Sequence, residues 1–202
     1  MDRGMDRIVP TTSFVPVADF LVKQRVTISL VVFSTLVAKD ILLGMKPHDT
    51  GNLGDPYAAA GIVLVLWGLA VRSWAAGVIR KSKVLATTGP YGLCRHPLYL
   101  GSLAMMLGFC TIVGSVLDLC VVLGPVLAIY LLTIRREERR LAERHGEAWR
   151  QYTTLVPRLL PTRVFTNLRT EWSLDQWMTN REYKALVTSL AALMVLHFWQ
   201  RF

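Results

Sequence analysis

Long apolar runs alternate with short polar and basic stretches along the chain, and this alternation predicts membrane-spanning helices. Crossing a bilayer requires about 20 apolar residues. We expect four spans, at about Val26 to Met45, Tyr57 to Ile79, Leu98 to Gly114 and Val116 to Ile134. A fifth run, about Ala185 to Trp199, either crosses the bilayer with its flanking residues snorkelling or lies in the interface as an amphipathic helix. The expected fold is all-α, a polytopic membrane helical bundle of four to five transmembrane helices.

The connecting segments suggest a single membrane domain over residues 1–202. Residues 1–24 form a polar N-terminal arm. The sequence Val113-Gly114-Ser115 predicts a tight reversal that makes the third and fourth spans a helical hairpin. A charged helix is expected to follow, from Arg135 to about Tyr152. Residues 162–202 form a C-terminal tail.

Composition agrees with a membrane protein. Of the 202 residues 52% are hydrophobic, and the mean hydropathy is +0.38. A net charge of +9 would suggest nucleic acid as the partner of a soluble protein. Here the basic residues lie between apolar runs, so we predict the lipid bilayer as partner and no nucleic acid. Three cysteines in or beside the spans indicate neither a disulfide framework nor a metal site, and oligomeric state is not readable from the sequence.

Lysine and arginine counts predict the orientation. Residues 1–25 contain four, residues 80–95 contain four and residues 135–184 contain eleven, whereas the loop 46–56 contains one. The three basic regions are therefore expected to face the cytoplasm, which makes the protein an integral, multi-pass membrane protein with its functional segments on the cytoplasmic side.

One segment between the second and third spans has the features of a ligand site. It begins with the turn signal Gly89-Pro90 and ends with Pro97 at the expected first position of a helix. His96 precedes that proline, so its backbone is biased to an extended conformation outside the helix. The free N–H groups of a helix start suit an anionic ligand group. The alternative is that its arginine and tyrosines are ordinary interfacial anchors.

Arg72 in the second span leaves two interpretations open. An ionisable residue at membrane depth indicates a functional group that faces protein or water, whereas snorkelling to the nearby basic interface needs no function.

Two segments resemble a known family. The first is Gly89-Pro90-Tyr91 followed by Arg95-His96-Pro97-Leu98-Tyr99-Leu100-Gly101, and the second is Glu137-Glu138 with Leu141, Gly146, Tyr152 and Val156-Pro157-Arg158-Leu159-Leu160-Pro161. Together, over residues 80–161, they resemble the signature of the isoprenylcysteine carboxyl methyltransferase and phospholipid methyltransferase superfamily. That resemblance implies an integral membrane methyltransferase with S-adenosyl-L-methionine as cofactor, in a cytoplasmic pocket.

The resemblance also implies which residues contact the cofactor. Glu137 would supply a carboxylate for its ammonium group, while aromatic rings contact its sulfonium. The implied cofactor-binding residues are Lys83, Val84, Leu85, Ala86, Tyr91, Arg95, His96, Pro97, Leu98, Tyr99, Gly101, Glu137 and Glu138. No catalytic residue is assigned, and His96 and Arg135 are secondary candidates. No metal is expected.

The methyl acceptor is expected to be lipophilic or embedded in the membrane. Isoprenylcysteine enzymes place an arginine four residues before the cofactor-binding glutamate, and this chain has Thr133 there. This departure weakens the case for an isoprenylcysteine carboxylate and leaves phospholipid amines, thiols and other small lipophilic acceptors open. Transfer to a carboxylate or thiolate depends mainly on positioning and exclusion of water.

Two other functions compete with methyl transfer. Sterol-reductase-type membrane enzymes have a related C-terminal motif and bind NADPH, although they usually have more spans than this chain offers. A non-catalytic membrane protein of the same fold is the other alternative.

Overall fold

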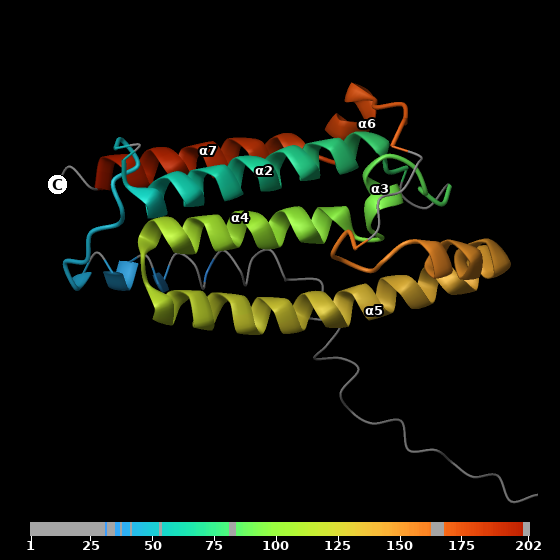
Figure 1. The fold of residues 1–202 in the computed structure, drawn as a ribbon, viewed down its shortest axis with the longest axis horizontal. Helices are drawn as coiled ribbons and strands as arrows, with labels where there is room; N and C mark the ends of the chain where they lie inside the picture. The colour runs from blue at the N-terminus through green and yellow to red at the C-terminus, as the bar shows by residue number, and fades with distance from the viewer. Residues whose placement is uncertain are drawn as a thin grey trace, which may run out of the picture.

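The computed structural model describes residues 31, 35–36, 38–40, 42–52, 54–80, 84–162 and 168–199. Every regular element in this part of the chain is a helix, as the hydropathy pattern predicts (Figure 1). The arm 1–24, much of the expected first span and Lys83 lie outside the described residues. The helices are α2 (Pro56–Val78), α3 (Pro90–Leu93), α4 (Pro97–Val113), α5 (Val116–Leu155), α6 (Leu174–Thr179) and α7 (Glu182–Trp199).

The antiparallel helices α2 and α4 lie at the centre of the fold, and glycines let their backbones touch. A Cβ atom added at Gly61 would lie 2.7 Å from the carbonyl oxygen of Gly108, and one added at Gly101 would lie 2.6 Å from that of Gly68. Small residues permit such close approach between membrane helices. A buried apolar cluster extends from this contact to α7 and consists of Val65, Leu69, Phe109, Ile112, Val113 and Leu196.

The predicted hairpin between the third and fourth apolar runs is confirmed. α4 ends at Gly114, which has the left-handed conformation (φ 78°, ψ 8°) that glycine adopts without strain. Ser115 then caps α5 by accepting a hydrogen bond from the backbone N–H of Asp118. The expected fourth span and the charged helix after it form one element, because α5 runs on to Leu155 with a bend at Gly146 (φ 50°, ψ −117°).

Two of the described helices, α2 and α5, are long and apolar enough to cross a membrane. They correspond to the second and fourth expected spans. The third expected span is the 17-residue helix α4, and the short C-terminal run is the 18-residue helix α7. The number of four to five spans stays a prediction.

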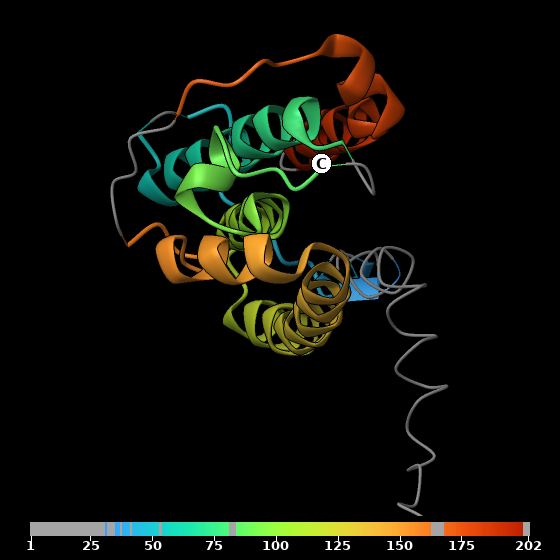
Figure 2. The same cartoon turned by 90° about the vertical axis from the view of Figure 1, so that its right-hand side faces the viewer.

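α7 runs antiparallel to α2 along its length (Figures 1 and 2). At one end, Arg72 of α2 donates to the buried carboxylate of Glu182, from Nε at 2.7 Å and from Nη2 at 2.9 Å. At the other end, the Thr50 hydroxyl lies 3.1 Å from Nδ1 of His197. Of the two interpretations of Arg72, the structure favours a side chain that faces protein, since the ion pair ties α7 to α2.

Candidate functional site

The segment between α2 and α4 has the backbone that its prolines and glycine predict. Gly89 has a positive φ of 61° and precedes Pro90, the first residue of the single-turn helix α3. His96 is non-helical (φ −130°, ψ 59°) and Pro97 begins α4, as predicted. The imidazole is 4% exposed, so the non-helical backbone at His96 directs its ring into the protein.

The bend at Gly146 returns the end of α5 to this segment. Arg95 donates from its backbone N–H to the carbonyl of Pro157 (2.9 Å) and from Nε to the carbonyl of Val156 (2.8 Å). The hydroxyl of Tyr152 donates to the backbone carbonyl of Tyr91 at 2.7 Å. The two segments that carry the family resemblance are therefore directly hydrogen-bonded to each other.

Glu138 anchors that contact through an ion cluster. Its carboxylate lies 2.8 Å from Nη1 of Arg95, 2.6 Å from Nη2 of Arg158 and 3.4 Å from Nε2 of His96. Burial alone would raise the pKa of Glu138, but hydrogen bonds from His96 and Arg158 and the charge of Arg95 outweigh burial and lower the pKa to about 2. Glu138 lies beyond the apolar part of α5 and is ionised at neutral pH.

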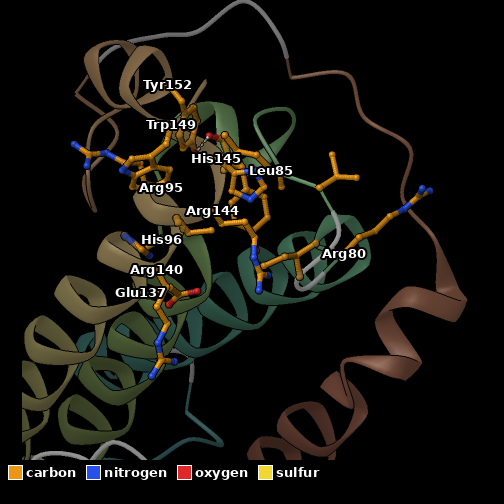
Figure 3. Close-up of a pocket in the computed structure, with 15 residues that line it drawn as sticks. Arg80, Leu85, Arg95, His96, Glu137, Arg140, Arg144, His145, Trp149 and Tyr152 are labelled. Atoms are coloured by element: carbon orange, nitrogen blue, oxygen red, sulfur yellow. Dashed lines mark hydrogen bonds between the residues drawn. The ribbon is translucent and has the colours of Figure 1, made fainter. Parts of the chain in front are cut away.

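Glu137, the neighbouring carboxylate, instead lines a cavity of about 390 Å³ (Figure 3). Oε2 of Glu137 accepts a hydrogen bond from the Tyr99 hydroxyl at 3.2 Å. The cavity lies between the segment after α2, the segment before α4, and α5. Its lining consists of Ile79, Arg80, Val84, Leu85, Ala86, Tyr91, Arg95, His96, Glu137, Arg140, Leu141, Arg144, His145, Trp149 and Tyr152.

The lining includes Tyr91, whose hydroxyl is a fully buried polar atom. The Tyr91 side chain is 5% exposed, and its hydroxyl has no hydrogen-bond partner among the described residues. Burial raises the pKa of this hydroxyl well above its usual value, so it keeps its proton as a donor. A buried donor without a partner costs free energy, which a bound acceptor atom would recover.

The polar and apolar groups of the lining fit S-adenosylmethionine. Glu137 can accept from an ammonium group, and Tyr91 can donate a hydrogen bond. Apolar and aromatic groups around them, among them Leu85, Leu141 and Trp149, suit an adenosine.

Some of the cofactor-binding residues predicted from the sequence line the cavity and others do not. Those in its lining are Val84, Leu85, Ala86, Tyr91, Arg95, His96 and Glu137. Pro97, Leu98, Tyr99 and Gly101 lie in the first turns of α4, outside the lining. Gly101 packs against α2, Glu138 holds the ion cluster, and Arg135 is exposed.

The residues that sequence reasoning missed lie on the cavity side of α5. Neither Arg140 nor His145 is among the site residues predicted from the sequence. With Arg144 and Trp149, both line the cavity. A signal was available: Glu137, Leu141 and His145 recur every fourth residue, and such residues share one helix face.

A second cavity of about 380 Å³ adjoins the first and shares Arg80 and residues 84–86 with it. Its other lining residues are Val78, Thr87, Thr88, Thr170 and Glu171. Among the described residues, no group of three or more histidine, cysteine, aspartate or glutamate side chains could hold a metal ion.

Comparison with known proteins points to one family. The phospholipid methyltransferase family matches residues 52–148. The chain is 32% identical over 145 residues to the cobalt-zinc-cadmium resistance protein CzcN of Cupriavidus metallidurans, covering 71% of this chain and 66% of that protein. It is 29% identical over 148 residues to the nickel-cobalt-cadmium resistance protein NccN of Alcaligenes xylosoxydans xylosoxydans, covering 72% and 68%.

Sterol reductases match over a shorter region. The Delta(14)-sterol reductase of Arabidopsis thaliana is 38% identical over 86 residues, which covers 38% of this chain and 21% of the reductase. No solved structure matches the chain.

Proposed function

Because this chain belongs to the isoprenylcysteine carboxyl methyltransferase and phospholipid methyltransferase superfamily of membrane methyltransferases, we propose that it transfers a methyl group from S-adenosylmethionine to a lipophilic acceptor. The observation that carries the proposal is the cavity in which the segment before α4 meets Glu137 of α5. Segments separated by a whole helical hairpin converge there, and both belong to the family resemblance.

Different lining residues would bind different parts of the cofactor. Glu137 accepts hydrogen bonds from the cofactor ammonium, Tyr91 donates to a polar atom of the cofactor, and residues 84–86 contact it through their backbone. The N-terminal end of α4, from Pro97 to Gly101, supports this wall of the site, since Tyr99 orients Glu137 through its hydroxyl. Glu138 positions Arg95 and His96 and holds the end of α5 in place.

When bound, S-adenosylmethionine supplies a methyl group on a sulfonium, and transfer forms a bond between the acceptor's nucleophile and the methyl carbon as the sulfur–methyl bond breaks. The chain contributes orientation and the exclusion of water. Trp149 and Leu85 form part of the apolar wall that would exclude water. No residue is assigned as a base; His96 and Arg135 remain secondary candidates.

The lengths and contacts of the helices support a proposed arrangement in the membrane. α2 and α5 cross the bilayer, α4 packs between them, and α7 crosses beside α2, because its ends are tied near both ends of that helix. The segments with most of the lysines and arginines lie at the same end as the cavity, so the site faces the cytoplasm. An acceptor embedded in the bilayer would then reach the cavity laterally.

A second candidate is an NADPH-dependent reduction. The similarity to sterol reductases favours it, but the match spans about a fifth of the Arabidopsis enzyme. The cavity's arginines would also suit the phosphates of a nicotinamide cofactor.

Isothermal titration calorimetry on the purified protein in detergent distinguishes methyl transfer from NADPH-dependent reduction. We expect binding of S-adenosylmethionine and S-adenosylhomocysteine and no binding of NADPH. Binding of NADPH alone would support the reductase. If folded protein bound none of the three, the enzymatic proposal would be wrong and a non-catalytic role would take its place.

A further inference from the structure

Arg72 of α2 contacts two other helices at once. Its Nε and Nη2 atoms donate to the two carboxylate oxygens of Glu182 on α7, at 2.7 and 2.9 Å. The remaining nitrogen, Nη1, donates to the hydroxyl of Ser102 and, at 3.5 Å, to the backbone carbonyl of Leu98, both on α4. Ser102 in turn donates to that carbonyl at 2.9 Å. The guanidinium group therefore joins α7 to the beginning of α4.

A glycine makes room for this contact. Gly101 lies on α4 between the two residues that Arg72 contacts, and a Cβ atom added to it would lie 2.7 Å from Cγ of Arg72. Small residues permit such close approach between membrane helices. A larger side chain at Gly101 would displace the stem of the arginine and separate its guanidinium group from Ser102.

The other side of the same helical turn carries Tyr99 toward α5. α4 lies between α2 and α5 (Figure 1). The Tyr99 hydroxyl donates to Oε2 of Glu137 at 3.2 Å, and its ring meets the ring of Tyr130 edge-on, with centroids 5.1 Å apart. Leu98 and Ser102 face α2 instead, where Arg72 contacts them. A shift of this turn relative to α2 would therefore move Tyr99 relative to Glu137.

We propose that Arg72 is a positioning residue for the cofactor: it fixes the beginning of α4 so that Tyr99 meets Glu137. This inference rests on the proposed function of the cavity. A guanidinium group suits the role because its donors form a rigid fork, so that pairing with Glu182 orients Nη1 toward α4. The helix α7 thereby contributes to the cavity, although none of its described residues lines it.

The alternative is that the ion pair only joins α7 to α2. The variant R72M/E182M separates the two roles, because apolar residues in place of a buried ion pair often leave a protein equally stable. This variant lacks the contacts with α4 and leaves no buried charge unpaired. Thr50→Val is the matched control, since it removes the contact with His197 that ties the other end of α7.

The test is isothermal titration calorimetry of the full chain in detergent with S-adenosylhomocysteine, well below the Tm of each variant. We expect R72M/E182M to keep a Tm close to that of wild type and to bind at least about fivefold more weakly. Ser102→Ala keeps the ion pair and removes the hydroxyl that accepts from Arg72, and it should weaken binding at least about threefold. Thr50→Val should change the affinity less than about twofold.

A double-mutant cycle identifies the route of the effect. Tyr99→Phe removes the hydroxyl that contacts Glu137 and should itself weaken binding about fivefold. If Arg72 acts through Tyr99, then R72M/E182M added to Y99F should cause less than about twofold further loss, because the contact with Glu137 is already absent. A purely structural role of the ion pair would give the same loss in both backgrounds.

Three results would overturn the inference. These are an affinity within twofold of wild type in either R72M/E182M or S102A, an equal loss in T50V, or losses that multiply in the Y99F background. If R72M/E182M does not fold, S102A decides by the same criteria, alone and combined with Y99F. Wild type that binds no S-adenosylhomocysteine would contradict the proposed function and this inference together, whereas wild-type binding that the variants do not weaken contradicts the inference alone.

Discussion

Replacing Glu138 by glutamine should destabilise the protein without removing a cavity residue. Glu138 is 11% exposed at its side chain and lies within hydrogen-bonding distance of Arg95, His96 and Arg158. Glutamine keeps the shape but leaves two guanidinium groups without an anion. Removing one partner of a fully buried ion pair costs roughly 3–5 kcal/mol.

The pKa of Glu138 gives a second measure of the same effect. A shift from 4.5 to about 2 corresponds to about 3 kcal/mol at 1.36 kcal/mol per pKa unit. Arg158 is 46% exposed, so solvent screening reduces the effect, and we expect a loss of about 2 kcal/mol. For a chain of this length, that corresponds to a decrease of roughly 4–8 °C in Tm.

The assay is thermal unfolding in detergent of E138Q and of the matched variant E147Q, since Glu147 is exposed and lies 3.8 Å from Arg150. E147Q should change the free energy of unfolding by less than about 0.5 kcal/mol. Because the folded pKa of Glu138 is depressed, its stabilising effect is present above the unfolded pKa of 4.5 and is lost as pH falls toward 2. The difference between wild type and E138Q should therefore narrow below pH 4.5. Equal stability of the two variants, or a pH-independent difference, would refute this reasoning.

Four further substitutions test the fold by thermal unfolding. Gly68→Ala would place a Cβ 2.5 Å from a backbone oxygen of α4 and should lower the free energy of unfolding by about 1–3 kcal/mol. The control Gly124→Ala adds a Cβ with nothing within 4 Å and should be neutral or slightly stabilising. Equal effects of the two substitutions would contradict the close contact between α2 and α4. Tyr152→Phe removes one buried hydrogen bond and should cost about 1 kcal/mol; an unchanged Tm would show that the bond contributes nothing. Arg72→Met leaves Glu182, 4% exposed, without its cation and should cost about 3–5 kcal/mol; a loss below 1 kcal/mol would show that the pair does not tie α7 to α2.

Local sequence signals predicted the local structure well. Hydropathy located α2 and α4 to within a residue at each end, and Gly114 marked the reversal between α4 and α5. The His96-Pro97 pair predicted both a non-helical residue and the start of α4, although His96 (φ −130°, ψ 59°) is not fully extended. These features depend on neighbouring residues, so a single sequence contains the necessary information.

Features that depend on distant residues were not predictable in the same way. The two adjacent glutamates look alike in the sequence, and only the return of the chain after Gly146 separates them. That return places Arg158 beside Glu138, whereas Glu137 lines the cavity. Arg140 lines the cavity for the same reason, because residues that follow the bend at Gly146 form another part of the cavity wall.

The central claim is that the cavity binds S-adenosylmethionine through Glu137. The most direct measurement is the calorimetric affinity for S-adenosylhomocysteine of wild type, Glu137→Gln and the control Glu143→Gln, since Glu143 is exposed on the same helix and outside the cavity. We predict a loss of at least tenfold in E137Q, an unchanged affinity in E143Q and equal Tm values for all three proteins. Wild-type affinity in a folded E137Q protein would contradict the account.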